Sequence, residues 1–229
     1  MTDPPAGEIR AVIFDLDDTL YPERSYVFSG FAAVAAAFAD LLGDATAAAR
    51  DMRRFFDPDR RSRVFNALLA ERGVDPDPEL IDRLVAIYRA HAPTIQLRGD
   101  ADAALSRLGG RYQLGVITDG PPVQQRAKID ALGLADRVER IIVTGELGSG
   151  FAKPHPRAFE MMAASLAVDA RRCVYVADNA AKDFIAPNAL GWMTIQVRRP
   201  DGIYRETPAP PGGAPRFVVE MLDEIDRLL

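Results

Sequence analysis

Short apolar runs rich in β-branched residues recur along the chain, and such runs indicate strands that are buried on both faces. The first run, at residues 11–14, ends abruptly in acidic residues. Similar runs follow at residues 114–117, 141–143, 173–176 and 194–197. Each of the five runs therefore predicts one strand.

Between these runs the apolar residues fall at helical spacing. Residues 123–132 follow two prolines and end before Gly133, which is typical of the start and the end of a helix. Residues 159–166 and 217–228 each place their apolar side chains on one helical face. Strands that alternate with helices predict an α/β fold, a Rossmann-like parallel sheet with helices on both faces. Ligands of such sheets bind beyond the carboxyl ends of the strands.

One long segment breaks the alternation. No strand pattern occurs between residues 24 and 92, where apolar residues instead recur at helical spacing. Pro22 and Pro93 bound this segment. We therefore predict an all-helical cap domain, residues 23–92, inserted into an α/β core that comprises residues 1–22 and 93–229.

Composition narrows the class of protein. The 229 residues include 28 Lys and Arg against 33 Asp and Glu, a net charge of −5, which argues against binding to nucleic acid or to an anionic membrane surface. The most apolar helical stretch, residues 31–38, is far shorter than the roughly 20 residues of a membrane span. Cys173 is the single cysteine, so no intrachain disulfide can form. We expect a cytoplasmic protein, without a signal peptide, that is a monomer or a homodimer.

The acidic segment Asp15-Leu16-Asp17-Asp18-Thr19 directly follows the first predicted strand. If the extended geometry persists, Asp15 and Asp17 point the same way and repel each other by about 4 kcal/mol at 4 Å and an effective dielectric of 20. A cation or a proton between them would offset that repulsion, and oxygen ligands at a strand end suit Mg²⁺. The alternative is an acidic turn that caps a helix.

Polar residues also follow the later strands. Thr118 and Asp119 precede a helix, where a hydroxyl and turn amides can bind an anion. Lys153, one of only three lysines in the chain, lies in a loop between prolines. Asp178 and Asp183 follow the fourth predicted strand. Each feature has a structural alternative, namely a helix cap, a solvated charge or an N-cap, but their order after successive strands favours one shared site.

With these residues in this order, the sequence resembles a known family, the haloacid dehalogenase superfamily. The helical insert looks like that superfamily's type-1 cap, and Gln125-x-x-Lys128 resembles the stretch after the second motif in many of its hydrolases. One departure is Ala177, which precedes Asp178 where the family usually has glycine and where a methyl group could narrow a metal site. The four motifs that carry the resemblance are Asp15-x-Asp17-x-Thr19, Thr118, Lys153, and Asp178 with Asp183.

The resemblance implies a role for each acid. Asp15 would be the nucleophile that forms an aspartyl-phosphate, and Asp17 would protonate the leaving alcohol and then activate water. Mg²⁺ would bind Asp15, the backbone carbonyl of Asp17, and Asp178. Asp183 would belong to the outer shell of the metal or position the lysine of the third motif.

The phosphoryl group would be held by Thr118, Asp119 and Lys153. Thr118 and Lys153 would also be catalytic, because they offset charge on the transferring oxygens. The expected activity is that of a phosphatase acting on a small phosphorylated metabolite, of the sugar phosphate or nucleotide class. Dehalogenases of the superfamily lack the second aspartate and the metal, because a departing halide needs no proton; Asp17 therefore favours phosphate ester hydrolysis.

Two alternatives of other kinds stay open. A phosphomutase shares the aspartyl-phosphate but returns the phosphate to sugar. A non-enzymatic phospho-acceptor or binding protein, such as a signalling receiver, also combines acids, threonine and lysine with Mg²⁺. Receivers carry their acceptor aspartate on a middle strand of the sequence and lack a helical insert, so the pattern favours them least.

An arginine-rich stretch lies in the predicted cap. It has two interpretations: a contact with substrate, or a solvated helical face, which the interleaved aspartates favour. Its members are Arg53, Arg54, Arg60, Arg61 and Arg63.

Overall fold

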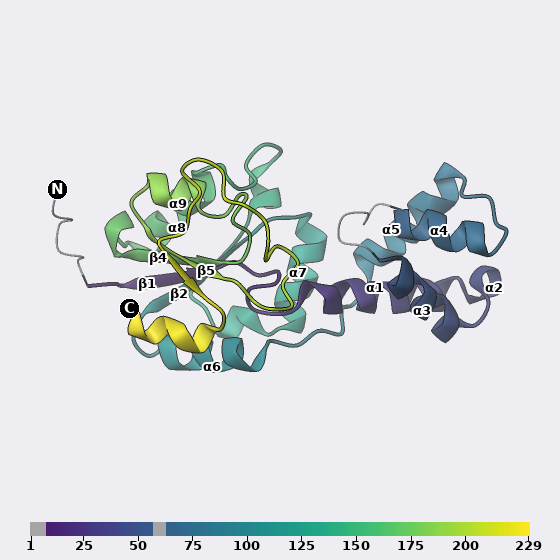
Figure 1. Cartoon of the computed structure of the whole chain (residues 1–229), viewed down its shortest axis with the longest axis horizontal. Helices are drawn as coiled ribbons and strands as arrows, with labels where there is room; N and C mark the ends of the chain where they lie inside the picture. Colours follow the sequence, from purple (N-terminus) through teal and green to yellow (C-terminus); the bar gives the residue numbers. More distant parts are fainter. Residues whose placement is uncertain (1–7, 57–62) are drawn as a thin grey trace. The chain divides into compact units, whose positions relative to one another are not determined.

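The computed structural model describes residues 8–56 and 63–229. These form two compact units (Figure 1). One unit comprises the described residues up to Pro22 together with Gln96–Leu229, and the other comprises the described part of Glu23–Ile95. None of the helices in the described residues is both long and apolar enough to cross a membrane.

The first unit is built on a six-stranded sheet in which every neighbouring pair of strands is parallel. The strands are β1 (Ala11–Phe14), β2 (Gln113–Thr118), β3 (Arg140–Val143), β4 (Cys173–Ala177), β5 (Met193–Val197) and β6 (Phe217–Val219). Their order is β3-β2-β1-β4-β5-β6, and the five predicted strands are all present. In this order the chain changes direction across the sheet between β1 and β4, which is where ligands of such sheets bind.

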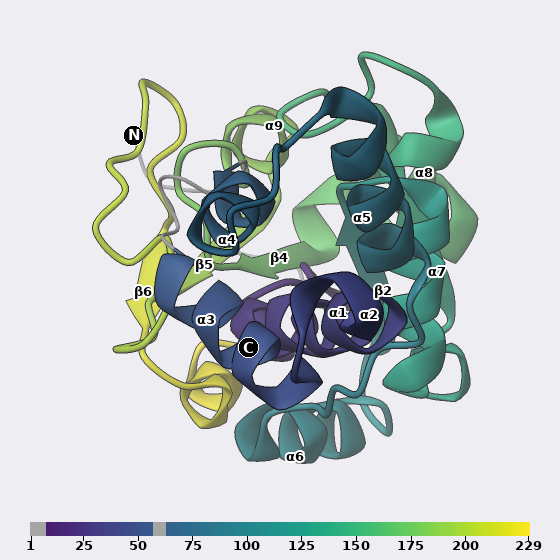
Figure 2. The ribbon, with the colours of Figure 1, turned by 90° about the vertical axis from the view of Figure 1, so that its right-hand side faces the viewer.

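Helices cover both faces of the sheet, as predicted. The helices of this unit are α6 (Gly99–Leu108), α7 (Pro122–Ala131), α8 (Arg157–Leu166) and α9 (Ile185–Ala189), with short 3-10 helices at Leu134–Asp136, Thr144–Leu147, Ala170–Arg172 and Leu222–Arg227. Figures 1 and 2 show α8 and α9 on one face, and α6 with the last 3-10 helix on the other. Each face of the sheet thus has a hydrophobic layer against it.

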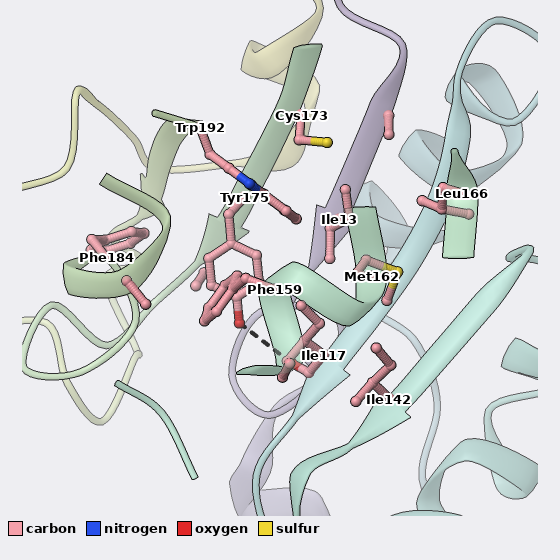
Figure 3. Close-up of a cluster of buried hydrophobic side chains, with 14 of the residues drawn as sticks. Ile13, Ile117, Ile142, Phe159, Met162, Leu166, Cys173, Tyr175, Phe184 and Trp192 are labelled. Carbon is pink, nitrogen blue, oxygen red and sulfur yellow. Dashed lines mark hydrogen bonds between the residues drawn. The ribbon is translucent and has the colours of Figure 1, made fainter. Parts of the chain in front are cut away.

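The hydrophobic layer beneath α8 supports the edge of the sheet at the carboxyl ends of its strands (Figure 3). Ile13 and Ile117 of the central strands are fully buried there with Phe159 of α8. The Phe159 ring lies edge-to-face against Tyr175 of β4, with 4.9 Å between centroids, and against Trp192 at 5.6 Å. Burial of each large side chain contributes about 1.5–3 kcal/mol. The Tyr175 ring is therefore fixed in the core while its hydroxyl donates to the Ile117 carbonyl, 3.3 Å away.

The C-terminal segment corrects one prediction. A single helix over residues 217–228 was expected, but Phe217–Val219 forms β6, paired parallel to β5. The edge of β5 offers unpaired backbone groups, and pairing with it takes precedence over the helical spacing. The Glu224 carboxylate accepts the backbone N–H groups of Glu220 and Met221, so a helical turn begins only after them. Met221 is consequently 48% exposed rather than buried.

The second unit is all-helical in its described residues, as predicted for the insert. Its helices are α1 (Glu23–Ala37), α2 (Ala39–Leu42), α3 (Ala45–Phe55), α4 (Val64–Glu71) and α5 (Pro78–Ala90). The carboxylates of Asp44 and Asp77 cap α3 and α5 by accepting the N–H groups of Ala47 and Leu80. The unit has its own apolar core, which includes Phe31, Val34, Leu42, Met52, Leu68 and Leu84.

The arginine-rich stretch lies partly in α3. Arg54 pairs with Glu71 of α4 at 2.6 Å, and the Arg53 guanidinium lies 5.1 Å from the centroid of the Phe28 ring. Arg63 is exposed at the start of α4. Arg60 and Arg61 lie outside the described residues. The contacts of Arg53 and Arg54 are those of a solvated helical face within this unit.

Candidate active site

The polar residues singled out by the sequence follow strands that end at the same edge of the sheet. Asp15 comes directly after β1, and its N–H donates to the Val176 carbonyl at 2.8 Å, which extends the pairing with β4 by one residue. Thr118 is the last residue of β2, and Asp178 follows β4. Parallel topology therefore brings residues more than 100 positions apart to one edge.

Lys153 lies at the centre of this edge, and its side chain is fully buried. Its Nζ is 2.6 Å from Asp15 Oδ1, 2.8 Å from Asp183 Oδ1 and 3.0 Å from the Tyr175 hydroxyl. Burial alone would lower the pKa of this lysine, but the facing carboxylates of Asp15 and Asp183 raise it well above its ordinary value. The ammonium therefore stays charged.

Three buried carboxylates surround that ammonium. Asp15, Asp178 and Asp183 each offer an oxygen within 4.8 Å of the others, and they are the acids in the described chain that are grouped closely enough to hold an ion. Burial raises the pKa of Asp15 to about 7, in spite of Lys153. Burial, and then repulsion by Asp183 and Asp15, raise the pKa of Asp178 well above its usual range.

These carboxylates suit a divalent cation. Lys153 supplies one positive charge to three acids, and Asp178 Oδ2 is buried without a hydrogen-bond partner among the described residues. Asp183 Oδ2 accepts the N–H of Asn179 at 3.0 Å, which fixes its orientation. Buried oxygen ligands with excess negative charge are the donor set that Mg²⁺ prefers. The residues present therefore fit this metal.

The Asp17 carboxylate has different partners. Its Oδ1 is 2.7 Å from Lys128 Nζ and also accepts the Tyr21 hydroxyl, and its Oδ2 is 3.1 Å from Gln125 Nε2. Burial raises the pKa of Asp17, but the charge and hydrogen bond of Lys128, together with hydrogen bonds from Tyr21 and Gln125, outweigh burial and lower it. Since β1 ends at Phe14, the extended geometry does not persist to Asp17. Its carboxylate is not in the group of three acids, and metal binding through its backbone carbonyl stays a prediction.

Thr118 and Asp119 are both held by hydrogen bonds. Thr118 Oγ1 is fully buried and lies 2.5 Å from Gln125 Nε2. The Asp119 carboxylate accepts the Thr144 hydroxyl at 2.8 Å, the Lys153 N–H at 3.1 Å and Lys182 Nζ at 2.7 Å. This carboxylate ties three loops together, and phosphate binding at Asp119 stays a prediction.

Ala177 is the last residue of β4 and is fully buried. It belongs to the apolar cluster beneath α8. Its methyl group is thus part of the core packing.

Gln125 was noted only through the resemblance of Gln125-x-x-Lys128 to a family stretch, and its side-chain contacts in the site were not predicted. Tyr21 and Tyr175 also contact the site, and they carry no signal of their own in the sequence, because tyrosine is common in cores. Lysine usage does carry one: of 28 basic residues only three are lysines, Lys128, Lys153 and Lys182. Every one of them contacts an acid of this site.

Comparison with known proteins agrees with this geometry. Residues 9–191 match the profile of the haloacid dehalogenase-like hydrolases. A glyceraldehyde 3-phosphate phosphatase of Methanopyrus kandleri is 28% identical over 96% of this chain and 98% of its own length. A phosphoserine phosphatase of Thermus thermophilus is 32% identical over 65% of this chain and 57% of its own length.

Solved structures share the fold. The HAD-hydrolase YfnB from Bacillus subtilis, bound to magnesium, superposes with a TM-score of 0.68 at 19% identity, covering 97% of this chain and 99% of its own. A 2-haloacid dehalogenase from Pseudomonas syringae superposes with a TM-score of 0.63 at 24% identity, covering 96% and 97%. The motifs at the sheet edge, the matched profile and the common fold agree, and this chain belongs to the haloacid dehalogenase-like hydrolase family.

Proposed function

We propose that this protein is a Mg²⁺-dependent phosphatase that hydrolyses a small phosphorylated metabolite through an aspartyl-phosphate on Asp15. The observation that carries the proposal is the separation of the two acids of the first motif. Asp15 lies against the Lys153 ammonium and within the group of three carboxylates, while Asp17 lies among Lys128, Tyr21 and Gln125. One acid is thus available to attack phosphorus and the other to transfer a proton.

The reaction has two displacements at phosphorus. In the first, an Asp15 oxygen forms a bond to phosphorus and the bond from phosphorus to the ester oxygen breaks. Asp17 is ionised beside Lys128 in the free protein and takes up a proton when the anionic ester binds; it gives this proton to the leaving oxygen so that an alcohol departs. In the second, water attacks the phosphorus of the aspartyl-phosphate, Asp17 takes back a proton, and Asp15 is released with inorganic phosphate. Lys153 and Thr118 hold the phosphoryl oxygens, together with amides of the turn at Asp119.

The metal would be held by Asp15, Asp178 and the backbone carbonyl of Asp17. Asp183, which offers an oxygen within 4.8 Å of those of the other two acids, orients Lys153 and borders the ion. Bound Mg²⁺ supplies positive charge that offsets the charge on the phosphoryl oxygens. Lys153 stays charged beside it and contributes a second cation at the same point.

Asp17 favours phosphate esters over haloacids as substrates. Halide is a stable anion, whereas an alkoxide must be protonated as it leaves, so the half-buried second acid has a use only with the ester. The relatives with curated names support the same class: they are named for glyceraldehyde 3-phosphate, phosphoserine, pyrimidine 5′-nucleotides and ribulose 1,5-bisphosphate. All of these are small organic phosphates.

A phosphate-release assay tests the proposal. The full chain is incubated with glyceraldehyde 3-phosphate, phosphoserine, a pyrimidine nucleoside monophosphate and glucose 1-phosphate, each in Mg²⁺ and in EDTA. We expect release that requires Mg²⁺. Equal rates in the two conditions would reject the metal assignment, and conversion of glucose 1-phosphate to glucose 6-phosphate without free phosphate would indicate a mutase.

A variant tests the role of Asp17. Asp17→Asn should lower the turnover of an alkyl phosphate by about 10²–10⁴-fold, the usual contribution of general acid–base catalysis. Asp130→Asn is the matched control, since this aspartate is exposed on α7 and its replacement should leave turnover unchanged. Retained activity of Asp17→Asn on alkyl phosphates would contradict the proton-transfer role.

A further inference from the structure

The Asp17 carboxylate is held at both oxygens, by groups that the proposed reaction does not use. Lys128 and Tyr21 contact Oδ1, and Gln125 contacts Oδ2. Gln125 and Lys128 are three residues apart on α7, so they project from the same face of the helix. Their exposed fractions are 1% and 6%, which places both polar side chains inside the protein.

Burial makes these contacts informative. A buried ammonium is expensive unless it is paired, and a buried amide is expensive unless it is hydrogen-bonded. An apolar residue on this face of α7 would pack without either penalty. Lysine and glutamine are present instead, and both are directed at one carboxylate.

The same amide nitrogen connects two parts of the site. Gln125 Nε2 lies 2.5 Å from Thr118 Oγ1 and 3.1 Å from Asp17 Oδ2, so it joins the ends of β1 and β2. Gly120 leaves the space for this side chain: it has φ +141°, and a Cβ there would lie 3.1 Å from the Gln125 side chain. The turn before α7 is thus shaped around the glutamine.

We propose that Lys128 and Gln125 are positioning residues, which hold the Asp17 carboxylate in one orientation, apart from the acids that would bind the metal, for both of its proton transfers. This inference rests on the proposed phosphatase function. An unrestrained aspartate could turn toward a nearby cation and become a ligand. A carboxylate held at both oxygens is kept available to the leaving alcohol and then to water.

The positioning role predicts a dependence on the leaving group. An alkyl phosphate needs a proton from Asp17 in the first displacement, whereas 4-nitrophenyl phosphate has a leaving group stable enough to depart without one. Water attack on the aspartyl-phosphate needs Asp17 with either substrate. Loss of Lys128 should therefore slow both displacements with the alkyl phosphate. With 4-nitrophenyl phosphate it should slow only the attack of water on the aspartyl-phosphate.

The experiment compares Lys128→Met with wild type on both substrates, in Mg²⁺, by steady-state and rapid-mixing kinetics. We expect kcat for the alkyl phosphate to fall by about 10²-fold with KM changed by less than about threefold. With 4-nitrophenyl phosphate we expect a burst of about one nitrophenolate per site at the wild-type rate, followed by slow turnover. The burst amplitude also counts correctly folded sites.

Two further variants complete the test. Arg126→Met is the matched control, because Arg126 is exposed on α7, pairs with Glu146 and should leave both rates unchanged. In the Asp17→Asn background, Lys128→Met should cause no further loss, since two residues that act through one group are not additive. Gln125→Leu should lower the ratio of alkyl to aryl turnover by about tenfold, and it decides the matter if Lys128→Met does not fold.

The outcomes separate the two proposals. Wild type without phosphatase activity, or active Asp17→Asn, would overturn the proposed function itself. If wild type is active and Asp17→Asn is not, any of three results overturns the positioning role. Lys128→Met could turn over both substrates at the wild-type rate, or it could lose burst rate and turnover equally on both substrates. The third such result is that adding Lys128→Met to Asp17→Asn lowers turnover by the same factor as in the wild-type background.

Discussion

Replacement of Lys153 by methionine removes the one ammonium that lies between buried carboxylates. Attraction between unit charges at 2.6 Å and 2.8 Å amounts to about 6 kcal/mol for each pair at an effective dielectric of 20. Desolvation of the ions offsets most of this, and removal of one partner from a buried ion pair typically lowers stability by about 3–5 kcal/mol. For a chain of this size that loss corresponds to a fall of about 10 °C in Tm.

The stability deficit of Lys153→Met should depend on metal and on pH. Mg²⁺ binds the same acids, so it should raise the Tm of the variant more than that of wild type. In the metal-free protein the pKa of Asp15 is about 7, above the value near 4 of an unfolded aspartate, so the folded state binds more protons in that window. The contribution of Asp15 to stability therefore falls as the pH rises from about 4 to 7. Because Lys153 opposes this shift, the deficit of the variant should grow over the same window.

Thermal unfolding followed by circular dichroism measures these effects, in EDTA and in Mg²⁺, at pH 5 and pH 7.5. Lys182→Met is the control, since the Lys182 side chain is 34% exposed and its one ion pair within the described part of the chain is with Asp119, and we expect a loss of about 1 kcal/mol. Equal losses for the two variants would refute the reasoning. So would a Tm gain in Mg²⁺ that is no larger for Lys153→Met than for wild type.

Two substitutions outside the reacting groups test the fold that supports the site. Asp100→Asn weakens a buried ion pair with Arg199 at 2.8 Å and a hydrogen bond from the Leu222 N–H. The substitution should lower the free energy of unfolding by about 3 kcal/mol in urea titrations at pH 7. In the folded state Arg199 and Leu222 outweigh burial and lower the pKa of the Asp100 carboxyl, so the stability that this carboxylate contributes is lost on acidification. The difference in stability between wild type and Asp100→Asn should therefore shrink below about pH 4. Gly145→Ala would overlap the Gly120 carbonyl oxygen and should lower Tm by about 5 °C in thermal scans.

Matched variants define what would contradict these two expectations. Asp102→Asn changes an exposed aspartate on α6 and should alter stability by less than about 0.5 kcal/mol. Gly110→Ala adds a methyl group with no atom within 4 Å and should leave Tm unchanged. A loss for either control equal to that of its partner would mean that burial and overlap are not the causes.

The five predicted strands and the helical insertion followed from local pattern, because each depends on side chains close in sequence. The run 11–14 is apolar at every position, since β1 is covered on both faces. Residues 217–219 gave the wrong prediction because their partner, the edge of β5, is about 20 residues away. Helical spacing describes a segment by itself, and here a non-local backbone pairing decided the outcome.

Topology allowed us to predict which residues lie in the site, but not which of their atoms contact each other. Parallel strands bring their carboxyl ends to one edge, so residues placed after β1, β2 and β4 must come near each other. Which atoms meet depends on loop conformation. Asp15 and Asp17 are two positions apart, yet the strand ends at Phe14 and their carboxylates contact different lysines.

Asp119 illustrates why such pairings escape sequence reasoning. Its carboxylate accepts hydrogen bonds from groups 25, 34 and 63 residues further along the chain. None of these separations reflects a helical or strand period, so no periodic pattern marks them. The physical trace that does survive in the sequence is compositional. In a chain that otherwise uses arginine, each of the three lysines pairs with an acid of the site, where its ammonium supplies a point charge rather than the planar fork of a guanidinium.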